Sequence, residues 1–120
     1  MAEKRLTIAF DLDGTLAEYH GYEGPFIFGP PNPGMKELFE RLQKQGHDCG
    51  IYSCRNNEEV NYWCKRYDIK PTWINRNQFL SIDCINKPFA DIYIDDKCIK
   101  FTGCADKLES EIHDFKEWWK

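Results

Sequence analysis

Short apolar segments alternate with amphipathic segments along this chain, and no other feature limits its fold as strongly. Leu6–Phe10 and Cys49–Ser53 have the length and character of buried strands. Further strands are predicted at Pro71–Asn75 and Ala90–Ile94, with a short fifth at Ile99–Phe101. Alternating strands and helices form a parallel sheet with right-handed crossovers and helices on both faces. We therefore expect an α/β fold: a three-layer, doubly wound, Rossmann-like sheet.

Three helices are predicted from apolar residues that recur at helical spacing. The first follows Pro33-Gly34, ends at Gly46 and carries the stripe Met35, Leu38, Phe39 and Leu42. The second begins at Asn56 or Asn57, with an apolar face of Val60, Trp63, Cys64 and Tyr67. The third is marked by Leu108, Ile112, Phe115 and Trp119. Residues 17–33 are predicted to form a long loop or a hairpin, and residues 76–88 are ambiguous.

Length and charge restrict the class of protein. The 120 residues fit a single domain over residues 1–120. The net charge of −4 argues against a partner such as duplex nucleic acid. No apolar run is long enough to span a bilayer and no signal-peptide core is seen, so we expect a cytoplasmic protein without a membrane partner. The six cysteines contain no C-x-x-C pair and are expected to be free thiols.

Reactive side chains follow three of the predicted strands. The segments are Asp11-Leu12-Asp13-Gly14-Thr15, Ser53-Cys54-Arg55 and Asp95-Asp96-Lys97. The carboxyl ends of parallel strands share one edge of a sheet, where ligands bind. Four carboxylates at one edge need compensation, and Mg²⁺ with a substrate phosphate would supply it.

The string from Asp11 to Leu16 resembles the D-x-D-G-T-L signature of the haloacid dehalogenase (HAD) superfamily of phosphatases. Ser53 resembles the second motif of that family, Lys87 the third, and Asp95-Asp96 the fourth. The resemblance implies a HAD-like fold and a Mg²⁺-dependent phosphomonoester hydrolase.

The same resemblance implies a role for each matching residue. Asp11 would be the nucleophile and Asp13 the general acid and base. Ser53 would bind a phosphoryl oxygen, and Lys87 would hold Asp11 and the phosphoryl charge. Mg²⁺ would lie between Asp11, the backbone carbonyl of Asp13 and one acid of the Asp95-Asp96 pair, with Asp96 favoured. The substrate phosphate-binding residues would be Ser53, Cys54, Arg55 and Lys87, since arginine suits phosphate recognition.

One spacing departs from the family pattern. Lys87 lies only eight residues before Asp95, closer than in many members. Lys70 and Lys97 therefore stay open as alternatives for the third-motif lysine.

The spacing also leaves no room for an inserted cap domain. Only 39 residues separate Asp13 from Ser53, and 33 separate Ser53 from Lys87. An open, capless site would admit a sugar phosphate, a nucleotide or a phosphorylated polymer end, and a homo-oligomer could shield it. Aromatic residues in the loop after the first motif would stack on a substrate or, as we favour, pack the loop: Tyr19, Tyr22, Phe26 and Phe28. Trp118-Trp119 is predicted to be core or an oligomer contact.

Three alternatives to a hydrolase are compatible with an acidic cluster at this edge. A phosphotransferase or phosphomutase would keep Asp11 and pass the phosphoryl group to another acceptor. A phospho-receiver domain would not need Asp13, and its acceptor would normally follow a middle strand. A non-catalytic interaction domain would have no reason to keep the motifs intact.

Overall fold

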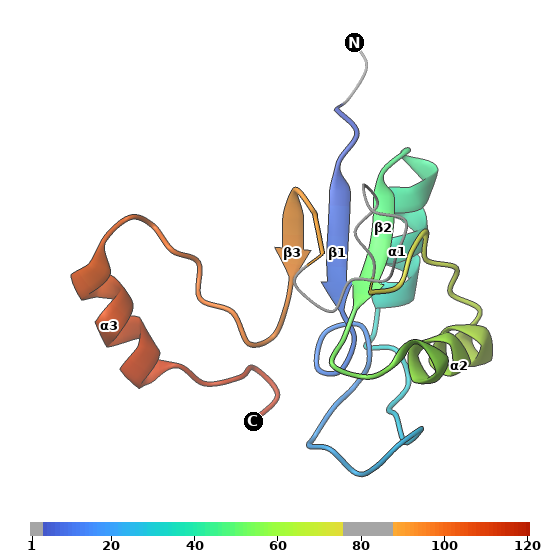
Figure 1. Ribbon diagram of the computed structural model, residues 1–120, viewed down its shortest axis with the longest axis horizontal. Coiled ribbons are helices and arrows are strands. Elements are labelled where there is room, and N and C mark those ends of the chain that lie inside the picture. The colour runs from blue at the N-terminus through green and yellow to red at the C-terminus, as the bar shows by residue number, and fades with distance from the viewer. Residues whose placement is uncertain (1–3, 76–87) are drawn as a thin grey trace.

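Three parallel strands form the centre of the protein in the order β2-β1-β3, and the computed structural model describes residues 4–75 and 88–120 (Figure 1). β1 (Thr7–Asp11) lies between β2 (Asp48–Tyr52) and β3 (Ile92–Ile94). The register places Asp11 beside Tyr52 and Phe10 beside Ile94. The predicted parallel α/β sheet is thus confirmed, and the ends of β1 and β3 meet at one edge.

The first two helices are close to the predicted ones. α1 (Met35–Lys44) follows Gly34, whose φ of 82° is in the left-handed region that glycine tolerates. α2 (Asn57–Tyr67) is capped by Asn56, whose side chain accepts a hydrogen bond of 2.9 Å from the Glu59 amide. Both helices therefore begin where local sequence signals predict.

These two helices share one apolar core with one face of the sheet. Ile8 and Phe10 of β1 belong to this core, and the rings of Phe10 and Phe39 lie 5.1 Å apart. The same buried cluster contains Cys49, Ile51, Val60, Trp63 and Cys64. β1 pairs with a strand on each side and packs against these helices. This packing fixes the position of Asp11 at the end of the strand.

The predicted strand at residues 71–75 is an extended segment beside β2 with a single bridge between Ile51 and Ile74. The Ile51 amide donates to the Trp73 carbonyl at 3.1 Å, and the Asn75 amide donates to the Ile51 carbonyl at 2.8 Å. A Cβ on Gly50 would lie 2.0 Å from the Trp73 ring, so the glycine makes room for that indole. The predicted short strand at residues 99–101 is wrong, because those residues form no strand.

The C-terminal helix differs most from prediction. α3 (Ala105–Asp114) ends before Phe115 and contains no buried residue. Figure 1 shows it apart from the sheet, with the chain then turning back toward the sheet edge. Within residues 4–75 and 88–120, α3 therefore does not supply the expected layer of helix on the second face.

Two smaller expectations concern cysteines and membranes. The five described cysteines are free thiols, as predicted, and Cys84 lies outside the described residues. No helix in the described ranges is long and apolar enough to cross a bilayer.

Candidate active site at the carboxyl edge of the sheet

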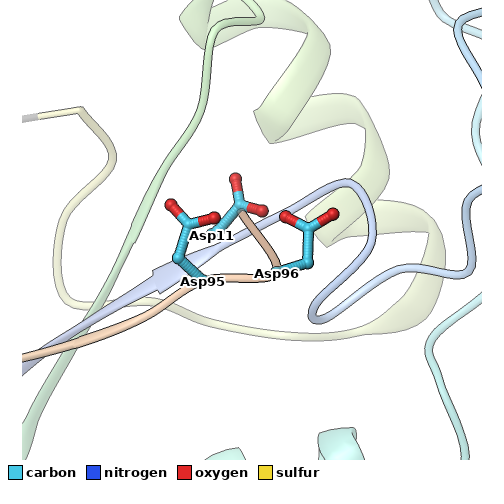
Figure 2. Close-up of side chains that lie close together, drawn as sticks. All are labelled: Asp11, Asp95 and Asp96. Atoms are coloured by element: carbon cyan, nitrogen blue, oxygen red, sulfur yellow. The ribbon is translucent and has the colours of Figure 1, made fainter. Parts of the chain in front are cut away.

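Three carboxylates meet where β1 and β3 end. Asp11 is the last residue of β1, and Asp95 and Asp96 directly follow β3. One oxygen of each lies within 4.8 Å of the others, and all three residues are half-buried (Figure 2). The predicted convergence of these acids is confirmed; we call this group the Asp11 cluster.

The surroundings of Asp11 strongly affect its protonation. Burial, a hydrogen bond with Asp96 and the charges of Asp95 and Asp96 raise the pKa of Asp11 from 3.8 to about 8. The Thr15 hydroxyl, which donates to Asp11 at 3.2 Å, acts in the opposite direction. Without a metal, Asp11 therefore keeps its proton near pH 7. Three carboxylate oxygens that form no salt bridge within residues 4–75 and 88–120 fit a hard divalent cation such as Mg²⁺.

Asp95 and Asp96 are held by different partners. Both oxygens of Asp95 accept hydrogen bonds, from the Tyr52 hydroxyl at 2.5 Å and from the Lys97 amide at 2.8 Å. Burial, followed by the hydrogen bond to Asp95, raises the pKa of Tyr52, so its hydroxyl remains a donor at neutral pH. Asp96 accepts at Oδ2 from the Trp119 indole at 2.5 Å. Protein donors thus occupy Asp95 more fully than Asp96.

Gly14 allows the loop after β1 to approach Asp96 closely. Its φ is 87°, and a Cβ there would lie 2.2 Å from Asp96 Oδ2. The Gly14 amide donates to the Ala17 carbonyl at 2.9 Å, and the Ala17 amide donates to the Leu12 carbonyl at 2.9 Å. This turn brings the segment after β1 directly against Asp96, which only glycine permits.

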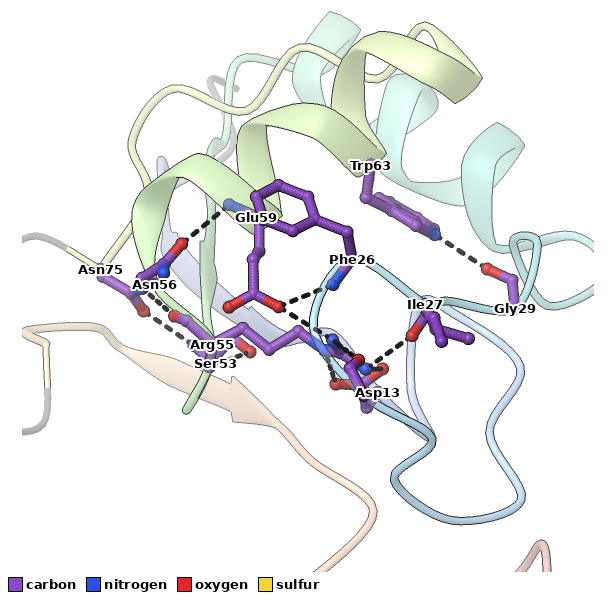
Figure 3. Close-up of polar contacts among 11 residues, drawn as sticks. Asp13, Phe26, Ile27, Gly29, Ser53, Arg55, Asn56, Glu59, Trp63 and Asn75 are labelled. Carbon is purple, nitrogen blue, oxygen red and sulfur yellow. Dashed lines mark hydrogen bonds and ion pairs between the residues drawn. The ribbon is translucent and has the colours of Figure 1, made fainter.

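The Asp13 carboxylate lies against the Arg55 guanidinium (Figure 3). Arg55 Nε donates to Asp13 Oδ2 at 2.7 Å, and Arg55 Nη1 donates to Glu59 Oε2 at 3.1 Å. We call Asp13, Arg55 and Glu59 the Asp13 cluster. The side chain of Asp13, predicted as a site residue, is not among the three converging carboxylates.

Arg55 does not have the role predicted for it. Its remaining contacts are donations to the Ile27 carbonyl at 2.8 Å, the Gly24 carbonyl at 3.3 Å and Asp13 Oδ1 at 3.5 Å. Its five N–H donors are thus engaged, and its side chain is only 5% exposed. Burial would lower the pKa of Arg55, but Asp13 and Glu59 outweigh it and raise that pKa. Arg55 is a buried counter-ion of Asp13, not a ligand for phosphate.

The loop after the first motif packs around Arg55. The guanidinium lies 4.0 Å from the Phe28 ring and 5.2 Å from the Tyr22 ring. The Phe26 amide donates to Glu59 at 3.1 Å and is the main cause of the lowered pKa of that carboxyl. The Trp63 indole donates to the Gly29 carbonyl at 2.9 Å. The expected packing role of this loop is confirmed for Phe28, while Tyr22 remains 64% exposed.

Ser53 and Cys54 begin the loop between β2 and α2. Ser53 is half-buried, and its hydroxyl accepts from the Arg55 amide at 3.0 Å. Cys54 is exposed. The Ser53 amide donates to Asn75 Oδ1 at 2.7 Å, and Asn75 Nδ2 donates to the Arg55 carbonyl at 3.2 Å. Asn75 thus fixes the loop that was predicted to bind phosphate. Sequence reasoning missed this role, although Asn75 follows an extended apolar segment and polar residues at that place are candidates for a site.

The predicted lysine Lys87 lies outside the described residues. Of its alternatives, Lys70 precedes the segment beside β2 and pairs with Asp68 at 3.8 Å, at the opposite edge of the sheet from Asp11. Lys97 is exposed next to Asp96. Of the two described candidates, only Lys97 therefore lies at the same edge of the sheet as Asp11.

The two C-terminal tryptophans contact the site, which sequence reasoning missed. The Trp118 indole donates to the Gly14 carbonyl at 2.7 Å, and Trp119 donates to Asp96. Their predicted role as core or oligomer contact gave no indication of this, because nothing in the spacing of residues 115–120 relates them to the first motif.

Comparison with known proteins supports the fold alone. No family model and no curated protein matches the chain. A solved structure of a conserved protein from Bacteroides thetaiotaomicron is similar, with a TM-score of 0.63 and 23% identity over 96% of this chain and 95% of that one. The chain therefore has an α/β architecture that is compatible with a Rossmann-like fold and occurs in a second protein of similar extent.

Proposed function

We propose that this protein is a Mg²⁺-dependent phosphomonoester hydrolase with a HAD-like, capless fold and an aspartyl-phosphate intermediate on Asp11. The observation that carries the proposal is the Asp11 cluster, in which a nucleophile-type carboxylate lies within 4.8 Å of two acids at the carboxyl edge of the sheet. Asp13, two residues later, is held apart from that cluster by Arg55. One acid is thus available for attack and another for proton transfer.

Asp11 and Asp96, with the Asp13 carbonyl, would hold the Mg²⁺ ion. Asp96 is favoured over Asp95 because both oxygens of Asp95 already accept protein hydrogen bonds. When bound, the ion would compensate the charge of the carboxylates and of the substrate phosphoryl group.

In the first step, a carboxylate oxygen of Asp11 forms a bond to phosphorus while the bond to the leaving oxygen breaks. Asp13 gives its proton to that leaving oxygen. In the second step, Asp13 takes a proton from a water molecule that attacks phosphorus, and the bond between phosphorus and Asp11 breaks. Arg55 directs Asp13 throughout, and Ser53 would donate a hydrogen bond to a phosphoryl oxygen. A site without an inserted cap suits a sugar phosphate, a nucleotide or a phosphorylated polymer end.

The test is Mg²⁺-dependent release of phosphate from p-nitrophenyl phosphate. Asp11→Asn should abolish activity, because an amide cannot form the acyl phosphate. Asp106→Asn is the matched control, since it changes an exposed aspartate on α3 that contacts no site residue named above. Turnover that survives Asp11→Asn, or that needs no Mg²⁺, would contradict the proposal.

A further inference from the structure

The last six residues bring the chain back to the candidate active site. α3 ends at Asp114, and Figure 1 shows the C-terminus returning toward the end of the sheet. Trp119 is half-buried, and its ring meets the Tyr19 ring edge-on at 5.1 Å. The segment 115–120 is therefore attached to the loop after β1, although α3 itself is exposed.

Two indole N–H groups attach this segment, and they reach different targets. Trp118 donates to a backbone oxygen, the Gly14 carbonyl, at 2.7 Å. Trp119 donates to a carboxylate oxygen, Asp96 Oδ2, at 2.5 Å. The first contact fixes the segment in place, while the second bears directly on a member of the Asp11 cluster.

An indole N–H is only a donor, so its contact with Asp96 constrains that carboxylate without adding a competing ligand. Gly14 lies close to both groups, since a Cβ there would be 2.2 Å from Asp96 Oδ2 and 2.7 Å from Trp119 Nε1. Because Oδ2 is hydrogen-bonded to the indole and packed against Gly14, rotation of the carboxylate is restricted. Partners of this kind orient metal ligands and commonly govern metal affinity.

We propose that Trp119 is a positioning residue, whose indole N–H fixes Asp96 in the orientation that a divalent cation beside Asp11 requires. The inference rests on the proposed function, because it assumes a cation at the Asp11 cluster. It assigns a task to the segment 115–120.

The test compares Mg²⁺ binding to the full-length unaltered protein, Trp119→Phe and Trp118→Phe, by calorimetry without substrate. Trp119→Phe keeps an aromatic ring against Tyr19 but removes the donor to Asp96, and should weaken Mg²⁺ binding about 10- to 100-fold. Trp118→Phe is the matched control, because it removes an indole donor whose partner is Gly14, and should change the affinity far less. Unfolding midpoints without Mg²⁺ should stay close in all three proteins.

Unchanged Mg²⁺ affinity in Trp119→Phe would overturn the inference and leave the proposed function standing. Tighter binding would also overturn it, because the indole would then obstruct the site. Equal weakening in both variants would show that the segment acts only by docking. No Mg²⁺ binding by the unaltered protein would overturn the proposed function as well.

A second readout does not depend on the folding of Trp119→Phe. Mg²⁺ binding should change the tryptophan fluorescence of the unaltered chain and of Trp118→Phe, because Trp119 contacts Asp96. Calorimetric binding of Mg²⁺ without such a change would contradict the inference.

Discussion

The Asp11 cluster and the Asp13 cluster begin two residues apart on one turn, but their charges are balanced in different ways. In the Asp13 cluster, the buried guanidinium of Arg55 pairs with Asp13 at 2.7 Å and with Glu59 at 3.1 Å. In the Asp11 cluster, no salt bridge among the described residues reaches Asp11, Asp95 or Asp96. There, burial and the neighbouring acids raise the pKa of Asp11, so a proton on Asp11 limits the negative charge of the cluster.

The difference indicates which cluster has its cation within the protein and which is open to an external one. A buried charge needs a partner, and Arg55 supplies that partner in the Asp13 cluster. The Asp11 cluster has three oxygen donors and no such partner in the described part of the chain. Carboxylates that are compensated only by a proton can exchange that proton for a metal ion.

Removing the cation of the Asp13 cluster should have the largest effect on stability. Arg55→Met leaves Asp13 and Glu59 without their counter-ion and should lower the free energy of unfolding by about 3–5 kcal/mol in urea titration. Adding Glu59→Gln should recover part of the loss, because it removes one stranded charge. Arg66→Met, at an exposed position on α2, is the control and should change the free energy little. If Arg55→Met lowered the free energy of unfolding by less than about 1 kcal/mol, as for an exposed ion pair, Arg55 would not be a buried counter-ion and the two clusters would not differ in this way.

The Asp11 cluster should instead reveal itself through pH. In metal-free protein the folded state keeps a proton on Asp11 up to about pH 8, whereas the unfolded chain loses it near its ordinary pKa of 3.8. The folded state binds more protons between these values, so the free energy of unfolding should fall as pH rises from about 4 to 8. The decrease should be on the order of a few kcal/mol.

Asp11→Asn should remove most of this pH dependence and stabilise the metal-free protein near pH 8. Chemical unfolding in the presence of a chelator, at several pH values, measures both effects. A parallel pH profile in the unaltered protein and in Asp11→Asn would show that Asp11 is ionised at neutral pH without a metal.

A side chain at Gly14, in the turn between the two clusters, should lower the free energy of unfolding by a smaller amount. Gly14→Ala combines a positive φ with a Cβ 2.2 Å from Asp96 Oδ2, and should cost about 2–3 kcal/mol of unfolding free energy. Gly46→Ala is a matched control, because its φ is 95° but a Cβ there meets nothing within 4 Å. It should cost about 1 kcal/mol. Equal costs for the two substitutions would show that contact with Asp96 is unimportant.

The smallest effect is expected at the outer acid of the Asp11 cluster. Tyr52→Phe deletes the hydroxyl that donates to Asp95 at 2.5 Å and should lower the free energy of unfolding by about 1.5 kcal/mol. Because Asp95 is then less fully hydrogen-bonded, it should compete better with Asp96 for Mg²⁺. Asp96→Asn should consequently weaken Mg²⁺ binding less in Tyr52→Phe than in the unaltered protein, as measured by calorimetry.

The sequence by itself determined the sheet and the residues at its edge. Short apolar runs identified β1 and β2, and helical patterns of apolar residues identified α1 and α2, because these elements contribute to a common core. Since parallel strands end at one edge, the meeting of Asp11 with Asp95 and Asp96 followed from the parallel arrangement.

Only the tertiary structure decided the partners of the charged groups. Arg55 lies two residues after Ser53, but its N–H groups donate to a loop and a helix that local patterns cannot place in space. Trp119 is separated from Asp96 by a helix that buries nothing, so its amphipathic spacing gave no sign of where the chain would return. Local periodicity reports which side of an element is apolar, whereas contacts between distant loops depend on how the whole chain is packed.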